Sequence, residues 1–159
     1  MARRRPAPET LSPLYYLFAA SQRAGTLLTE ALADAPLDAS GYALFSALRE
    51  TQPTSPTDLA RHLGMAVTTL LDAVAALSRR GLVVKLHNPR DGRSYLLRLS
   101  DEGESLHDRT EQFFSEADLR LRAHLGERGD DVIAALVAMR DAGDAALASL
   151  RAARAERTG

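Results

Sequence analysis

Residues 55–83 of the chain read SPTDLARHLGMAVTTLLDAVAALSRRGLV. The Ser55-Pro56 pair, with an acid in the turn that follows, is a strong start for a helix, and Gly64 ends that short helix. Periodic apolar residues then predict a second helix, from about Val67 to Arg80, which Gly81 ends. Two helices joined by a tight turn are typical of a helix-turn-helix.

Two short strands are expected next, at residues 82–87 and 94–99, joined by turn residues that favour a hairpin. Arg90 and Arg93 lie at the hairpin tip, where arginine can reach phosphates or a minor groove. We expect Asp91 to orient the Arg93 guanidinium group by a charge-assisted hydrogen bond. The alternative is a solvated turn with a weak surface ion pair. A hairpin after a helix-turn-helix is the order of a winged helix-turn-helix.

Helical periodicity and cap residues predict four more helices, at about residues 12–33, 39–50, 100–125 and 130–155. In the second of these, we expect the aromatic residue Phe45 to face the core. The predicted fold class is therefore mainly α, with a small β-hairpin wing and long helices at both ends of the chain.

The composition is that of a folded globular protein, with 45% hydrophobic and 26% charged residues. The chain has no cysteine, which excludes disulfides, thiolate zinc sites and thiol-based oxidant sensing. No apolar run approaches the roughly 20 residues of a membrane helix, and we recognise no signal peptide. We therefore expect a cytoplasmic protein with no membrane partner.

Charge is unevenly distributed, although the net charge is only −1. Residues 55–100 hold seven Lys or Arg against three Asp, whereas residues 101–159 hold eight Arg against thirteen acids. A basic middle between neutral and acidic flanks indicates a site for an anion such as nucleic acid. Chance clustering is the alternative reading of the charges alone.

The stretch from Ser55 to Gly103 resembles the MarR family of bacterial transcriptional regulators. The matching motifs are Asp58-Leu59-Ala60 with Leu63-Gly64, Leu77 through Val83, the wing Asn88 through Arg93, and Leu97 through Gly103. Residues 37–48 are similar to the second helix of that family, so with the long flanking helices the resemblance covers nearly the whole chain.

The resemblance implies a homodimer that binds a pseudo-palindromic site on double-stranded DNA with two recognition helices. The residues agree, because one winged domain cannot cover several long amphipathic helices without a partner. The expected organisation is a flexible basic arm at 1–11 and a single domain at 12–159, with a winged helix-turn-helix core at 37–100 and dimerisation helices at 12–34 and 101–156.

The recognition helix at 67–80 departs from the family pattern. Ala66 takes the expected cap position, and Leu71-Asp72 stands where a polar and basic pair is usual. Thr68 and Thr69 remain as expected DNA contacts. Asp72 either accepts a hydrogen bond from cytosine N4 or is a solvent-facing or internally paired acid. The Arg3-Arg4-Arg5 run either adds phosphate contacts or is an unstructured tail.

Members of the resembled family often release DNA when a small aromatic or anionic compound binds between the dimer helices and the winged domain. The residues that we expect to line such a crevice are Tyr16, Arg23, Tyr42, Arg49 and His107. An arginine near tyrosine rings suits a carboxylate or a phenol. The alternative places the tyrosines in a dimer core and the arginines on solvated faces.

Signals of an enzyme are lacking in the sequence. The four histidines are scattered, no metal-ligand spacing occurs, and neither a phosphate-binding glycine loop nor a nucleophile elbow is present. We therefore expect no catalytic residue, metal or cofactor. The predicted function is a sequence-specific, double-stranded DNA-binding transcriptional regulator that acts as a repressor; the alternative is a winged-helix protein-interaction module that has lost sequence-specific DNA binding.

Overall fold

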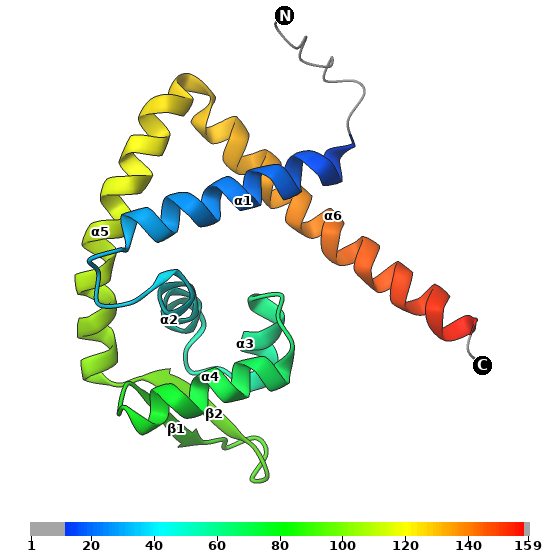
Figure 1. Cartoon of the computed structure of the whole chain (residues 1–159). Helices are drawn as coiled ribbons and strands as arrows, with labels where there is room; N and C mark the ends of the chain where they lie inside the picture. The colour runs from blue at the N-terminus through cyan, green and yellow to red at the C-terminus, as the bar shows by residue number, and fades with distance from the viewer. Residues whose placement is uncertain (1–11, 158–159) are drawn as a thin grey trace, which may run out of the picture. The chain divides into compact units, whose positions relative to one another are not determined.

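The structure is a computed structural model that describes residues 12–157. The chain forms two compact units that divide between Ala117 and Asp118. The elements are α1 (Pro13–Ala31), α2 (Ala39–Thr51), α3 (Pro56–His62), α4 (Val67–Arg79), β1 (Val83–His87), β2 (Tyr95–Leu99), α5 (Asp101–Leu125), the 3-10 helix η2 (Gly126–Arg128) and α6 (Gly129–Glu156) (Figure 1). This order confirms the predicted fold class. The expected arm at 1–11 lies outside the described residues, and no described helix is long and apolar enough to cross a membrane.

The predicted helix ends are confirmed where cap residues set them. Ser12 caps α1 by accepting a hydrogen bond from the backbone N–H of Tyr15 at 3.2 Å, with a proline in the first helical turn. Ser55 caps α3 in the same way. Gly64 and Gly81, with φ of +65° and +74°, take the left-handed conformation that ends a helix, which is costly for residues with a Cβ.

The wing is an antiparallel pair in which Val83 of β1 lies opposite Leu99 of β2 and His87 lies opposite Tyr95. An isolated β-bridge that we did not predict joins Thr54 to Leu97 on the other side of β2. There the backbone N–H of Thr54 donates to the Leu97 carbonyl at 3.1 Å, and the N–H of Leu97 donates back at 2.8 Å. The link between α2 and α3 is thus tied to the wing.

One hydrophobic core joins the helices of the first unit to the wing. Its largest side chains with almost no exposure come from α2, α3, α4 and β2: Phe45, Leu48, Leu59, Leu70, Val74, Leu97 and Leu99. The prediction that Phe45 faces the core is confirmed. Because the helix-turn-helix and the hairpin share this core, they are expected to move together.

The long helices carry apolar side chains that the chain itself leaves uncovered. No residue of α1 is buried, and its Leu14 and Phe18 are 72% and 62% exposed. In the second unit, no described residue of α6 is buried, and Leu150 of α6 and Leu119 of α5 are 64% and 67% exposed. Apolar stripes of this size usually lie against another surface.

Candidate nucleic-acid interface

Helix α3 begins at a compact polar cap that braces the helix-turn-helix. The Ser55 hydroxyl accepts from the backbone N–H of Asp58 at 3.1 Å and donates to its carboxylate at 2.7 Å. Arg61 pairs with the same carboxylate at 2.5 Å. These two side chains, Ser55 first, hold the pKa of Asp58 below its ordinary value. The carboxylate therefore stays charged at the positive end of the helix dipole.

Helix α4 has an inner and an outer face. Leu70, Val74 and Leu77 form the inner stripe and are buried against the core. Thr68 and Asp72, four residues apart, share the outer face and are exposed. The structure thus places two of the expected DNA contacts where a duplex can reach them.

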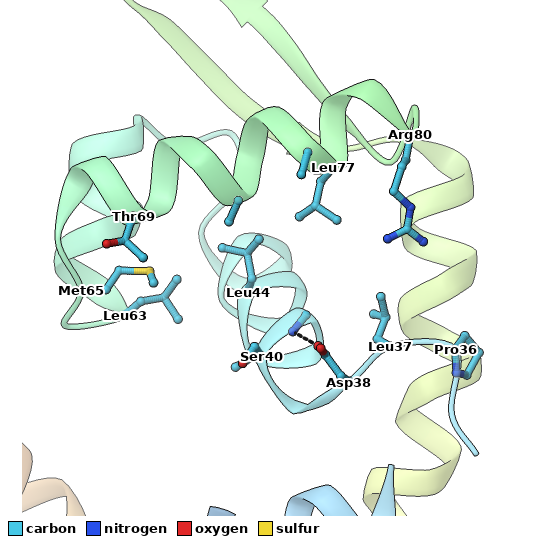
Figure 2. Close-up of a pocket in the computed structure, with 14 residues that line it drawn as sticks. Pro36, Leu37, Asp38, Ser40, Leu44, Leu63, Met65, Thr69, Leu77 and Arg80 are labelled. Carbon is cyan, nitrogen blue, oxygen red and sulfur yellow. Dashed lines mark hydrogen bonds between the residues drawn. The ribbon is translucent and has the colours of Figure 1, made fainter. Parts of the chain in front are cut away.

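Thr69 lies on a different flank of α4 from Thr68. It shares the i, i+4, i+7 row of Ala73 and Ala76, and all three line a cavity that faces the start of α2 (Figure 2). Thr69 is also exposed. The three polar residues expected to contact DNA are therefore divided between the outer face and the cavity.

The start of α4 is weakly polar, as the sequence indicated. Ala66 is the N-cap residue and makes no side-chain cap bond. Val67 and Leu71 are 37% and 38% exposed on the outer side of the helix. An apolar side chain at such a position can contact the methyl group of thymine, so the face is not incompatible with base reading.

Hydrogen bonds to the backbone brace the wing tip. The Asn88 side chain accepts from the backbone N–H of Arg90 at 3.0 Å and donates to the Ser94 hydroxyl at 2.7 Å. Asp91 accepts from the backbone N–H of Arg93 at 3.0 Å. Asp91 is therefore an Asx-turn residue that shapes the backbone of the tip, and its expected bond to the Arg93 guanidinium group stays a prediction.

The arginine side chains of the wing tip are consequently available. Arg90 and Arg93 are both exposed, and within residues 12–157 no hydrogen bond or ion pair engages their guanidinium groups. The loop that carries them projects beyond the helices of the first unit (Figure 1). Further up the hairpin, the Lys85 ammonium lies 4.5 Å from the centre of the Tyr95 ring, a cation–π contact that we did not predict.

Three of the residues expected to bind an effector meet between α2 and α5. The rings of Tyr42 and His107 stack with centroids 5.3 Å apart. The Tyr42 hydroxyl donates to Glu111 at 2.5 Å. Burial and the Glu111 carboxylate raise the pKa of Tyr42, so the hydroxyl stays protonated and keeps donating.

His107 is held between the Arg49 guanidinium group, which donates to it, and the Ser46 hydroxyl, which accepts from it, and this geometry fixes its tautomer. Its Nδ1 lies 2.8 Å from the Arg49 guanidinium group, which can only donate, so Nδ1 is the acceptor. Its Nε2 lies 2.9 Å from the Ser46 hydroxyl and carries the proton. Burial, and then the Arg49 charge, lower the pKa of His107. The ring is therefore neutral at pH 7.

Arg49 also pairs with acids of α5, with Glu104 at 3.5 Å and more closely with Asp108. Tyr16 and Arg23 lie on α1, where Tyr16 meets the Tyr15 ring edge-on and Arg23 donates to a carbonyl of its own helix. Within the described residues, no recorded contact joins these two to the cluster.

The sequence analysis missed the partners that complete this cluster. Ser46 follows Tyr42 by four residues on α2, and Glu111 follows His107 by four residues on α5. Those spacings put each pair on one helix face, so a search for polar stripes on both helices would have found them. Among the described residues, no group of His, Asp or Glu gathers as a metal site.

Comparisons with known proteins agree with this geometry. Residues 39–95 match the family model described as MarR. The transcriptional repressor CouR, solved bound to a 23-mer DNA duplex, is 23% identical over 88% of this chain and 99% of its own, with a TM-score of 0.74.

Two further solved structures are similar. PcaV of Streptomyces coelicolor, a transcriptional regulator in complex with its natural ligand, is 25% identical over 90% of this chain and 99% of its own, with a TM-score of 0.68. BpsR of Bordetella bronchiseptica, whose DNA binding is regulated by 6-hydroxynicotinic acid, is 21% identical over 86% and 98%, with a TM-score of 0.71. No curated protein sequence matches the chain.

Proposed function

This chain belongs to the MarR family of winged helix-turn-helix, DNA-binding transcriptional regulators, and from that premise we propose that it is a homodimeric repressor of a pseudo-palindromic operator. Regulators of this family are not enzymes. A regulator of this kind acts in the cytoplasm, where bacterial DNA lies. Residues 37–100 form the DNA reader, and residues 12–34 and 101–156 form the dimerisation helices.

One observation carries the proposal. Arg90 and Arg93 are exposed at the tip of the wing, within residues 12–157 no hydrogen bond or ion pair engages their guanidinium groups, and the exposed face of α4 belongs to the same unit. Arg90 and Arg93 insert into a minor groove or bind phosphates, while α4 enters the adjacent major groove. On α4, Thr68 and Asp72 face the base edges. The core that α4 shares with the hairpin holds both contacts in one register.

The uncovered apolar stripes support the dimer. Leu14 and Phe18 of α1, with Leu119 and Leu150 farther along the chain, are more than half exposed in a single chain. Burial of apolar surface stabilises by about 25 cal/mol per Å2, which is a strong drive for association. In a two-fold symmetric dimer, the α4 helices of the two protomers can then enter successive major grooves on one face of the duplex.

Release by a small molecule completes the proposal. The regulation of BpsR by 6-hydroxynicotinic acid and the ligand complex of PcaV support it by analogy. The dimer has one conformation that binds DNA and one that does not. A ligand lowers DNA affinity only to the extent that it binds the second conformation more tightly than the first.

The experiment begins with selection of duplexes from a random library by the full chain, followed by titration of the selected duplex at several salt concentrations. Arg93→Ala should weaken binding by about 1–3 kcal/mol and lower the salt slope by about 1. Arg128→Ala is the matched control, because it removes an exposed arginine from the turn before α6. Its affinity should equal that of the wild type.

Two results would reject the proposal. One is a chain that sediments as a monomer at micromolar concentration. The other is a stable dimer that selects no sequence, which would favour the alternative of a protein-interaction module. The exposed Val67 and Leu71 on the outer side of α4 are the feature that such a module would use.

A further inference from the structure

A single residue, Ser100, separates the wing from helix α5 (Figure 1): β2 ends at Leu99 and α5 begins at Asp101. The direction of the wing relative to α5 is therefore set at one corner of the chain. Residues 101–117 of α5 span about 25 Å, so a rotation of roughly 8° at this corner moves their far end by about 3.5 Å, close to one base-pair step of a duplex. Small rotations at the corner are thus large on the scale of DNA.

A backbone hydrogen bond holds this corner on the side of β1. There the Ser100 N–H donates to the Leu82 carbonyl at 3.0 Å. A corner that is held on one side can still open like a hinge. A second contact, on the edge of β2 that faces away from β1, is needed to prevent that opening.

Gln52 supplies the second contact with both ends of its side-chain amide. The amide oxygen accepts from the Leu99 backbone N–H at 2.8 Å, and the amide NH2 group donates to the Glu104 carboxylate at 2.6 Å. The first bond holds the last residue of β2, and the second holds the first turn of α5. Because the amide group is planar, its oxygen and nitrogen keep a fixed separation. The two bonds therefore fix the end of the strand and the start of the helix against each other.

The backbone of Gln52 is itself fixed to the core. Gln52 directly follows α2, and its N–H donates to the carbonyl of the buried Leu48 at 2.8 Å. Two residues later, Thr54 is bridged to the buried Leu97. The N–H groups of Leu97 and Leu99 point to the same edge of β2, so the Gln52 side chain adds an acceptor to the row that the Thr54 carbonyl begins.

The two partners of Gln52 require opposite chemistry. The Leu99 N–H needs an acceptor and the Glu104 carboxylate needs a donor, and a side-chain amide offers one of each. A carboxylate at position 52 would repel Glu104, whereas a cation there would leave the Leu99 N–H without an acceptor. Arg49 of α2 pairs with the same Glu104 carboxylate at 3.5 Å, which adds a second tie between the end of α2 and α5.

We propose that Gln52 is the positioning residue that fixes the wing against α5 and thereby sets the half-site spacing that the dimer accepts in its operator. The inference rests on the proposed function, in which α5 belongs to the dimer interface and the wing to the DNA reader. With the amide in place, the two readers keep one separation, and a duplex with another spacing must deform to fit. Without the amide, the corner opens and the readers adjust to more than one spacing. The best spacing then binds less tightly, because the readers must be ordered on binding.

The first measurement uses the full-length dimer without DNA. The chain has no cysteine, so Gly92→Cys at the wing tip places one spin label on each protomer, and no atom of the same chain lies within 4 Å of a Cβ built there. Electron paramagnetic resonance then gives the distribution of distances between the two wings. Gln52→Leu should widen this distribution by about half or more. Glu104→Ala, which keeps the bond to Leu99 and removes the partner on α5, should widen it as well.

The matched control is Thr51→Val, at the neighbouring position. The Thr51 hydroxyl donates to the Ala47 carbonyl of its own helix at 2.8 Å, so its loss leaves the corner intact and should leave the distance distribution unchanged. Thermal unfolding of each variant sets a temperature at which it is folded. If Gln52→Leu does not fold, Glu104→Ala carries both measurements.

The second measurement is the affinity for the selected duplex and for duplexes with one base pair added or removed between the half-sites. Wild type and Thr51→Val should lose about tenfold or more in affinity on either change, and Gln52→Leu less than about threefold. A duplex with a single half-site should bind wild type and Gln52→Leu equally. Gln52→Glu alone should behave like Gln52→Leu. Combined with Glu104→Gln, it restores a donor and an acceptor and should restore the wild-type spacing profile.

Two results would overturn the inference. One is an equal loss of affinity by Gln52→Leu at every spacing and on the single half-site, with unchanged distances between the wings, because Gln52 would then only stabilise the reader. The other is an exchange of Gln52 and Glu104 that fails to restore the spacing profile. A distance distribution that Gln52→Leu widens and the exchange narrows again, in a dimer that selects no duplex, supports the positioning role and rejects the proposed function instead.

Discussion

Gly103 of α5 is the position where a single methyl group should disturb the link between the long helix and the wing. A Cβ built there meets the carbonyl oxygen of Leu82 at 2.3 Å, whereas real Cβ contacts essentially never fall below 3.0 Å. That carbonyl is fixed, because it accepts from the N–H of Ser100 at 3.0 Å. Gly103→Ala must therefore displace backbone rather than a flexible side chain.

The magnitude follows from two opposed effects. Overpacking against backbone costs about 3 kcal/mol, the upper part of the usual range. Alanine regains about 1 kcal/mol of helix propensity over glycine. The net loss in the free energy of unfolding is about 2 kcal/mol, which corresponds to a fall in Tm of about 4–8 °C for a chain of this size. Since the start of α5 lies against the start of β1, DNA affinity should fall as well.

Denaturant unfolding and duplex titration measure the two effects. Gly143→Ala in α6 is the matched control, because no atom of the same chain lies within 4 Å of a Cβ built there. It should leave the stability unchanged or raise it by up to about 1 kcal/mol. If Gly103→Ala is as stable as wild type with the same denaturant slope, the close approach of α5 to Leu82 does not exist in solution, and the reasoning fails.

Three further outcomes are expected. Burial and Arg49 lower the pKa of His107 from its ordinary value of 6.5, so the unfolded chain takes up a proton at His107 before the folded chain does. The free energy of unfolding should therefore stay constant above pH 6.5 and fall as the pH drops below 6.5. In His107→Asn, the unfolding curves should depend less on pH below 6.5. Gln52→Leu should cost about 1–3 kcal/mol by chemical unfolding, because it strands the Leu99 N–H, which donates to the Gln52 side chain at 2.8 Å, and removes the donor to Glu104 at 2.6 Å; an unchanged free energy of unfolding would contradict this role of Gln52. Ser55→Ala removes the α3 cap and should cost about 1 kcal/mol; an unchanged unfolding midpoint would contradict that role.

The sequence predicted well those features that short segments determine. The ends of α1 and α3 follow from Ser-Pro pairs, and the ends at Gly64 and Gly81 follow from glycines that take positive φ. The order of helices and the hairpin follows from apolar periodicity. Each depends on interactions within about four residues, and these are visible in a linear pattern.

For the candidate site, the sequence predicted the wing arginines and the outer face of α4, but it did not predict the bond from Asp91 to the backbone. A carboxylate two residues before an arginine reaches either the backbone N–H or the guanidinium group. The turn conformation selects between them, and here it places the N–H at 3.0 Å. Helical spacing puts Thr69 and Thr68 on different flanks of α4, but only the position of α2 makes the flank of Thr69 a cavity wall.

The remaining features depend on residues far apart in the chain. The hydrogen bond from Tyr42 to Glu111 spans 69 positions, and the Gln52 bond to Leu99 spans 47. The cavity beside α4 and the close approach at Gly103 likewise arise where separate elements meet. Local propensity determined which segments of this protein are helices and strands. Only packing in three dimensions decided which polar groups face each other and where a cavity is left. These features depend on side-chain volumes and on distances between elements, which no linear pattern contains.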